Sequence, residues 1–148
     1  MGNRSILANP ALAGNKDRVN NKIKFRESFR PFAPSVLSEY AKEYFEMRGA
    51  DSPYMIMAFN TKEDKRNKIP AVVHVDGSAR VQTVTKEQNE KYFELIEEFN
   101  RQSSIPMLLN TSFNKAGEVL VNTPEQAIAA FLGSELDVLV IDKYLIQK

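Results

Sequence analysis

Residues 107–114, Met107-Leu108-Leu109-Asn110-Thr111-Ser112-Phe113-Asn114, join a short apolar run to a polar one. Three large apolar residues in a row are typical of a buried β-strand. Small polar side chains just past such a strand stand where α/β proteins place ligand contacts, because hydroxyls and amides bind phosphate oxygens without adding charge. An ordinary turn rich in Ser and Asn has the same composition. We therefore predict a buried strand over 107–109, followed by a candidate site.

The segments after this stretch and just before it predict two helices and a strand. Residues 86–101 place Tyr92, Leu95, Ile96 and Phe99 on one helical face. Thr123-Pro124-Glu125-Gln126 predicts a helix start, with a threonine cap, a proline in the first turn and a capping-box glutamine. Gly133 is expected to end that helix, and residues 137–141 form a final apolar strand.

The first half of the chain mixes short helical and extended patterns. We expect a short helix over 17–22, an edge strand or extended segment over 30–37, and a helix through 37–45 capped by Ser38. A strand follows over 54–59, and the charged loop over 61–68 is the segment most prone to disorder. Two further strands, over 71–75 and 79–84, are joined at Asp76-Gly77-Ser78. Alternating helices and strands predict an α/β or α+β fold around a mixed sheet.

The composition permits one domain and excludes several kinds of site. The 148 residues suffice for one domain with a real core, residues 1–148, of which 1–16 is expected to be a flexible arm. Twenty basic and 19 acidic residues give a formal charge of +1, so no global field favours a nucleic acid or a membrane. Cysteine is absent and histidine occurs once, which excludes thiol chemistry and histidine-rich metal centres. No apolar run approaches the ~20 residues that span a bilayer and no secretory signal is visible, so we expect a cytoplasmic protein.

Three cations, Lys24, Arg26 and Arg30, lie in one segment with two prolines. In an extended chain, residues at even spacing share a face, so the three would form a row suited to a polyphosphate. A solvated basic strand face is the alternative. Pro31 and Pro34 favour a fixed backbone around Arg30. A Lys-x-Arg that met Ser112 and Asn114 in space would make an oxyanion site.

Residues 74–80, His74-Val75-Asp76-Gly77-Ser78-Ala79-Arg80, predict a strand, a turn and a second strand. That arrangement would hold Arg80 near bound phosphates, and His74 could donate a hydrogen bond to an oxygen. A half-buried histidine bonded to the backbone is an equal alternative. His74 and Asp76 alone are too few ligands for a metal site.

These motifs carry a family resemblance. The pair Lys24-Phe25-Arg26 and Ser112-Phe113-Asn114 resembles the signature of YrdC-like nucleotide-binding domains. The longer sequence is similar to the C-terminal domain of the O-carbamoyltransferases of nodulation-factor and antibiotic tailoring. The matching segments are Gly2-Asn3-Arg4-Ser5-Ile6-Leu7, 24–37, Ser52-Pro53-Tyr54-Met55, 74–84, 108–114 and Thr123-Pro124.

The resemblance implies a YrdC-like twisted mixed sheet with flanking helices and a concave ligand-binding face. It also implies binding of ATP with Mg²⁺ and of carbamoyl phosphate, and formation of a carbamoyl-adenylate. The residues that would carry the chemistry are Lys24, Arg30, Arg80 and Ser112, and those that would hold the nucleotide are Arg26, Met55, Asn110, Asn114, Arg4 and His74, with no metal ligand among them.

The family pattern begins upstream of this chain, so we expect a piece that lacks an acceptor domain, its metal ion and an earlier arginine. Such a piece would bind ATP and carbamoyl phosphate weakly and would carbamoylate no alcohol by itself. Two other classes stay open: a non-catalytic nucleotide- or RNA-binding module, and a structural subdomain of a larger enzyme. The near-zero net charge argues against RNA. A membrane partner is not expected.

Overall fold

The computed structural model of this protein describes residues 2–148. In chain order the elements are β1 (Ser5–Ala8), α1 (Gly14–Arg18), the π-helix η1 (Val19–Lys24), β2 (Ala33–Leu37), α2 (Ser38–Tyr44), β3 (Ala58–Asn60), α3 (Glu63–Arg66), the 3₁₀ turn η2 (Pro70–Val72), β4 (Ser78–Arg80), β5 (Gln82–Val84), α4 (Glu90–Ser103), β6 (Met107–Ser112), α5 (Pro124–Leu132), β7 (Val138–Ile141) and β8 (Tyr144–Gln147).

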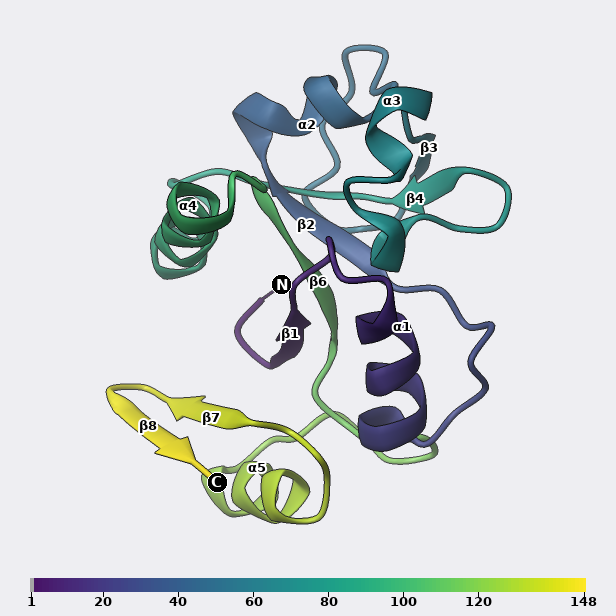
Figure 1. Ribbon diagram of the computed structural model, residues 1–148. Helices are drawn as coiled ribbons and strands as arrows, with labels where there is room; N and C mark the ends of the chain where they lie inside the picture. The colour runs from purple at the N-terminus through teal and green to yellow at the C-terminus, as the bar shows by residue number, and fades with distance from the viewer. Residues whose placement is uncertain (1) are drawn as a thin grey trace.

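Four strands form the central sheet in the order β1-β6-β2-β5 (Figure 1). Strand β6 is antiparallel to both β1 and β2, whereas β2 and β5 run parallel, so the sheet is mixed. A parallel pair needs a crossover connection, and α2, β3, α3 and β4 lie in the chain between β2 and β5. The predicted α/β fold around a mixed sheet is thereby confirmed.

Two antiparallel ribbons flank the central sheet. β3 pairs with β4 at the end of the molecule that carries α2 and α3, and β7 pairs with β8 beside α5 at the opposite end (Figure 1). All four residues of β8 are exposed. The ribbon at the chain's end therefore buries little surface through its last strand.

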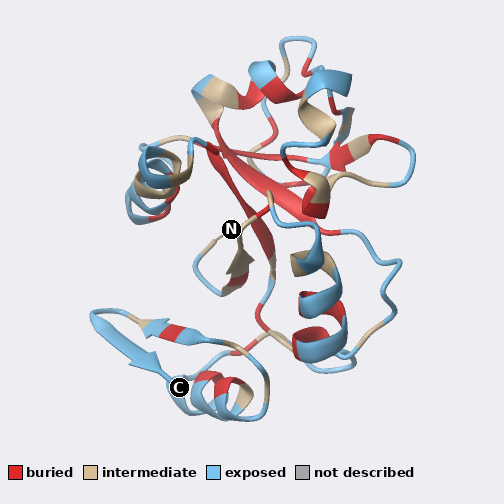
Figure 2. Ribbon diagram, viewed as in Figure 1, coloured by how far each residue is buried: buried red, intermediate tan, exposed pale blue. Residues whose placement is uncertain are grey.

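The core lies along β2 and β6, where Figure 2 shows continuous burial. All five residues of β2 and the first four of β6 are buried. A smaller apolar cluster under α4 joins Tyr92 and Ile96 to Leu37, Val84 and Leu108. Ile96 has no exposed surface, and full burial of such a side chain contributes about 1.5–3 kcal/mol. Helix α4 is thus held by the predicted apolar face through Tyr92, Ile96 and Phe99, whereas Leu95 on that face is exposed.

The two later helices confirm their predicted signals. The Thr123 hydroxyl accepts a hydrogen bond from the Gln126 amide, Pro124 is the first residue of α5, and Gly133 follows its last residue. The Gln126 side chain accepts from the Asn122 N–H, so the capping box closes one residue earlier than the usual pattern. Helix α4 begins at Glu90, after the cap Asn89.

The N-terminal segment differs from the flexible arm expected over residues 1–16. Ser5–Ala8 pairs with β6 over four residues, and α1 begins at Gly14. The local sequence of this strand shows no alternating apolar pattern that would predict it. The strand forms by pairing with β6, which lies more than 100 positions away in the chain. Met1 lies outside the described residues.

The segment 30–37 was predicted to be an edge strand or an extended segment, and the edge assignment is wrong. Strand β2 lies between β6 and β5. Its pairing with β5 begins at Ser35, so Pro34 stands before the stretch that is flanked on both sides. A proline lacks the N–H that a doubly paired position needs, and this offset accommodates it.

Three predictions in the middle of the chain are also wrong. A strand was expected over 54–59, but only residues 58 and 59 of that range belong to a strand, β3. The loop over 61–68, expected to be prone to disorder, contains the helix α3. The strand expected over 71–75 is replaced by the 3₁₀ turn that starts at Pro70, and β4 pairs with β3. The turn at Gly77 is present, with a φ of 82° and a hydrogen bond from the His74 N–H to the Ser78 carbonyl.

Two smaller features also differ from the prediction. Ser38 is the first residue of α2, whose cap position is Leu37 without a side-chain hydrogen bond, so Ser38 does not cap it. Strand β8 was not predicted. Within residues 2–148, no helix has the length and apolar character needed to cross a membrane.

Candidate functional site

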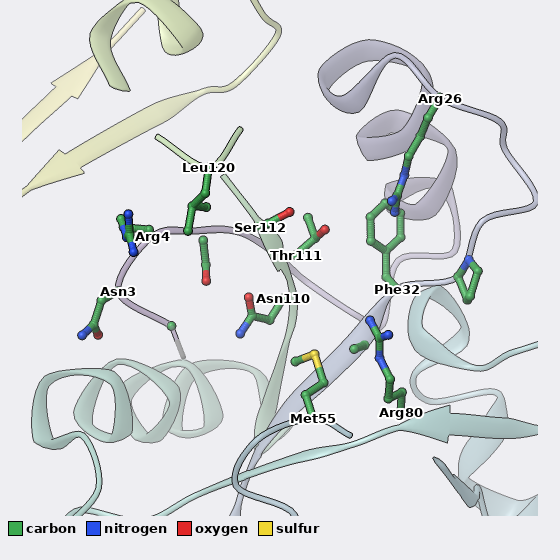
Figure 3. A pocket seen from close by; sticks show the side chains of 14 residues that line it. Asn3, Arg4, Arg26, Phe32, Met55, Arg80, Asn110, Thr111, Ser112 and Leu120 are labelled. Carbon is green, nitrogen blue, oxygen red and sulfur yellow. The ribbon is translucent and has the colours of Figure 1, made fainter. Parts of the chain in front are cut away.

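A cavity of about 540 Å³ opens beside the central sheet, within the usual size of small-molecule sites. Its walls come from segments far apart in sequence (Figure 3). The lining residues are Gly2, Asn3, Arg4, Ser5, Arg26, Pro31, Phe32, Ala33, Met55, Arg80, Asn110, Thr111, Ser112 and Leu120. This set contains three arginines and no carboxylate.

Each arginine of the cavity comes from a different part of the chain. Arg4 precedes β1, and its guanidinium donates to the Val121 carbonyl at 3.1 Å. Arg80 ends β4, and within residues 2–148 no hydrogen bond or ion pair engages its side chain. Figure 3 shows the Arg80 guanidinium directed upward to the cavity beside Phe32. Three cations without a carboxylate among them favour an anionic ligand.

Arg26 is held by two contacts that fix its plane. Its Nε donates to the Asn20 Oδ1 at 2.8 Å, and its guanidinium carbon lies 4.7 Å from the centre of the Phe32 ring. Burial lowers the pKa of Arg26, and the charges of Arg30 and Arg80 lower it further. An anion in the cavity would relieve this mutual repulsion of cations.

Lys24 is a buried cation with no carboxylate partner among the described residues. It is 3% exposed, and its ammonium donates to the Ser112 carbonyl at 2.7 Å and to the Asn114 Oδ1 at 2.6 Å. Burial, followed by the charges of Arg26 and Arg30, lowers the pKa of Lys24 to about 8. Among the described residues, the charge of Lys24 is therefore balanced by neutral oxygen atoms, such as the Ser112 carbonyl and the Asn114 Oδ1, rather than by a carboxylate.

Ser112 links this buried cation to the cavity. Its hydroxyl donates to the Asn114 Oδ1 at 2.6 Å and lies 3.2 Å from the Lys24 ammonium. Asn114 also donates to the Glu118 carbonyl at 2.7 Å, which folds the loop after β6 back on itself. The Ala116 N–H donates to the Lys24 carbonyl, so the same loop covers the end of η1.

Met55 enters the cavity from an irregular segment. It has a φ of 57°, a left-handed conformation that is uncommon outside glycine, yet it is only 7% exposed. Figure 3 shows its sulfur end directed into the cavity. Strained backbone at a ligand site is held by the surrounding structure, which makes Met55 a candidate wall for a flat apolar group.

Beneath the cavity, three polar side chains on neighbouring strands form a buried trio. Ser35 on β2 donates to the Gln82 Oε1 at 2.6 Å, and Asn110 on β6 donates to the Ser35 hydroxyl at 2.8 Å and to the Gln82 Oε1 at 3.2 Å. The Tyr92 hydroxyl is buried nearby without a hydrogen bond of ordinary geometry. Burial raises the pKa of Tyr92, an effect that Ser35 and Asn110 partly oppose.

The structure brings together most of the residues singled out in the sequence. Arg4, Arg26, Met55, Arg80, Asn110 and Ser112 line the cavity. Lys24 and Asn114 are not among its lining residues and reach it through hydrogen bonds to Ser112.

Two predicted residues are not in the lining of the cavity. Arg30 is exposed and lies 3.8 Å from the Glu27 carboxylate. His74 Nδ1 lies 3.2 Å from the Ser78 hydroxyl in the turn before β4, and burial lowers its pKa. The predicted row of cations on one strand face is wrong, because η1 ends at Lys24 and Phe25 has a left-handed φ of 52°.

Sequence reasoning missed one contributor and misplaced another that it had named. Phe32 supports the Arg26 guanidinium, and its place directly after Pro31 was the only local signal. Asn110 was expected past the end of its strand, whereas β6 continues to Ser112 and Asn110 is buried in it. Within residues 2–148, no group of three or more His, Cys, Asp or Glu side chains is placed to hold a metal ion.

A second cavity, of about 690 Å³, lies between β1, α4, α5 and the β7 ribbon. Its lining is mainly apolar, with contributions from Leu7, Tyr92, Leu95, Val121 and Leu139. It shares Arg4 with the first cavity and holds no cluster of cations. The concentration of positive charge therefore distinguishes the first cavity as the candidate site.

Comparison with known proteins identifies the family of the chain. The sequence model of the family described as carbamoyltransferase C-terminus matches residues 1–148. The chain is 49% identical over 150 residues to nodulation protein NolNO of Sinorhizobium fredii and 47% identical over 150 residues to nodulation protein NolO of Bradyrhizobium diazoefficiens. Each match covers 100% of this chain, but only 22% and 27% of those proteins.

A third relative, nodulation protein U of Sinorhizobium fredii, is 44% identical over 117 residues, which covers 79% of this chain and 21% of that protein. The chain thus spans about a quarter of the length of the curated relatives it matches. The match over the whole chain decides its classification: the protein belongs to the carbamoyltransferase C-terminus family.

Proposed function

We propose that this domain binds ATP and carbamoyl phosphate and forms a carbamoyl-adenylate, which the rest of a longer protein passes to an alcohol. The observation that carries the proposal is the convergence of Arg4, Arg26 and Arg80 on one cavity whose described lining has no carboxylate. Both co-substrates are anionic, and fixed guanidinium groups suit phosphate oxygens.

The reaction has two steps. Water first cleaves carbamoyl phosphate to carbamate and inorganic phosphate. A carbamate oxygen then forms a bond to the α-phosphorus of ATP, and the bond from that phosphorus to the bridging oxygen breaks, so pyrophosphate leaves with the electron pair. Negative charge spreads over the phosphate oxygens in such a transfer, and cations fixed in advance stabilise it without reorganisation.

The positions of the side chains support a division of roles. Arg26 and Arg80 would hold phosphate oxygens, and Ser112 would orient the reacting group with Lys24 and Asn114 behind it. Met55 would pack against the adenine. Mg²⁺ would arrive with the nucleotide, since this cation is usually bound through phosphates and few carboxylates. The exposed position of Arg30 gives it a weaker role, through its charge alone.

Calorimetry and pyrophosphate release test the proposal on the 148-residue chain. We expect binding of both ATP and carbamoyl phosphate. Arg80→Ala should weaken it by about ten- to a hundredfold, because a hydrogen bond to a charged group contributes roughly 1.5–3 kcal/mol. Arg30→Ala should weaken it less, and Arg101→Ala, at the far end of α4, should leave it unchanged.

Pyrophosphate release should depend on the presence of both co-substrates and should fall in the Arg80→Ala protein. If the parent chain binds neither ATP nor carbamoyl phosphate at millimolar concentration, or if Arg80→Ala and Arg101→Ala behave alike, the cavity is not the carbamoyl-adenylate site.

A further inference from the structure

The buried trio defined above occupies three adjacent strands of the central sheet. Ser35 and Gln82 are register partners on β2 and β5, and Asn110 lies on the other side of β2, on β6. All three residues are at most 4% exposed. Polar side chains in such a place are unfavourable unless their hydrogen bonds are satisfied, and an apolar trio would have filled the sheet more simply.

The hydrogen bonds within the trio give the Asn110 amide a direction. An asparagine amide has two N–H donors and one carbonyl acceptor. Its nitrogen donates twice, to the Ser35 hydroxyl at 2.8 Å and to the Gln82 Oε1 at 3.2 Å. The Ser35 hydroxyl donates its own hydrogen to Gln82 at 2.6 Å. Both donors of Asn110 are therefore engaged inside the sheet.

The Asn110 carbonyl oxygen has no such partner among the described residues, yet the residue lines the arginine-rich cavity. Figure 3 shows the end of the side chain directed from β6 into the cavity, between Arg4 and Met55. The only other amide in the described lining is that of Asn3, whose Oδ1 accepts a hydrogen bond from Asn89 Nδ2 at 2.7 Å, and the remaining polar side chains are cations or hydroxyls. Asn110 is thus a neutral acceptor, fixed from behind, in a site otherwise suited to anions.

We propose that the Asn110 carbonyl oxygen accepts a hydrogen bond from the amino group of the carbamoyl moiety. Ser35 and Gln82, which orient the Asn110 amide, would then set the specificity for a carbamoyl over an acyl phosphate. This inference rests on the proposed function, because it identifies which part of that substrate Asn110 contacts. A carbamoyl group differs from an acetyl group by an NH₂ in place of a CH₃. An acceptor satisfied only by the amino group rejects the methyl analogue, because binding the analogue leaves a buried carbonyl without a partner.

The test compares carbamoyl phosphate with acetyl phosphate as ligands of the 148-residue chain, by calorimetry without ATP. We expect carbamoyl phosphate to bind at least about tenfold more tightly, the discrimination that one unmet buried hydrogen bond gives. Asn110→Leu should bring the ratio of the two affinities near one. Ser35→Ala, which removes one acceptor of the Asn110 amide, should lower the ratio severalfold while ATP affinity stays within about twofold.

Ser52→Ala is the matched control. The Ser52 hydroxyl is also buried and donates to the Val81 carbonyl at 2.8 Å, but it is outside the trio. It should lose similar stability and keep the parental ratio. A ratio that falls equally in Ser52→Ala and Ser35→Ala would reflect general loosening and would overturn the assignment.

The wild-type measurement by itself decides between two failures. If the chain binds carbamoyl phosphate and acetyl phosphate equally, Asn110 presents its N–H groups or contacts another part of the ligand, and this inference is wrong while the proposed function stands. If the chain binds neither ATP nor carbamoyl phosphate, the proposed function itself fails.

Discussion

The Lys24 ammonium donates to the Ser112 carbonyl at 2.7 Å, although the two residues are 88 positions apart in the chain. This bond joins the end of η1 to the end of β6. It also places a buried positive charge directly behind a hydroxyl that lines the cavity. The contact therefore ties the stability of the domain to the electrostatics of the candidate site.

The first prediction concerns the pH dependence of stability. The pKa of Lys24 in the folded protein is about 8, below the ordinary 10.5, so between these values the unfolded chain binds the extra proton. The free energy of unfolding should then rise with pH from about 8 upward, by at most about 1.4 kcal/mol per pH unit. Urea denaturation of the parent and of Lys24→Met at pH 7, 8, 9 and 10 measures the difference.

Lys24→Met keeps an unbranched apolar stem and removes the titrating ammonium group. The difference in free energy of unfolding between parent and variant should change in the parent's favour between pH 8 and 10. Parallel pH profiles would show that Lys24 titrates at its ordinary pKa in the folded protein.

The second prediction separates charge from geometry at Arg26. Arg26→Lys keeps the charge but loses the hydrogen bond from Nε to Asn20 and the stacking on Phe32. Because a lysine ammonium cannot reproduce a planar guanidinium, we expect ATP affinity to fall about tenfold. Arg18→Lys, at an exposed pair with Asp137, should leave ATP affinity unchanged. Equal affinities for the parent and Arg26→Lys would indicate that only the net charge matters.

The third prediction uses two glycines in different surroundings. Gly2 has a φ of 99°, and a Cβ there would meet the buried Tyr92 ring at 2.4 Å. Gly14 begins α1 and has nothing within 4 Å of an added Cβ. Gly2→Ala should destabilise the protein by about 1–3 kcal/mol, whereas Gly14→Ala should stabilise it by about 0.4–1 kcal/mol. Denaturant midpoints of the two variants should therefore move in opposite directions, and a neutral Gly2→Ala would mean that the segment before β1 is not packed against Tyr92 of α4.

The fourth prediction compares two possible helix caps. The Thr123 hydroxyl accepts from the Gln126 N–H, so Thr123→Ala should lower the free energy of unfolding by about 1 kcal/mol. Ser38 makes no capping bond at the start of α2, and Ser38→Ala should change it by less than about 0.5 kcal/mol. Thermal unfolding of both variants checks this contrast, which an equal loss in the two would contradict.

Local patterns predicted the elements whose signals lie within one segment. Helices α4 and α5 and strand β6 were predicted from apolar spacing, caps and composition, because these features act over a few residues. The expectations for 1–16, 61–68 and 71–75 failed for the opposite reason. Strand β1 exists through its pairing with β6, and the 71–75 segment has no strand neighbour, so neighbouring structure decided both.

The candidate site shows the same division. The sequence by itself determined which chemical groups are available: the cations Lys24, Arg26 and Arg80, and the polar run from Asn110 to Asn114. Only the tertiary structure decided which of them meet. Because η1 ends at Lys24, the three cations do not lie on one strand face as predicted. Arg30 is exposed to solvent, whereas Lys24 is buried behind Ser112. Strand order then sets Asn110 against Ser35 and Gln82, because hydrogen bonds between strands depend on pairing partners that no local sequence specifies.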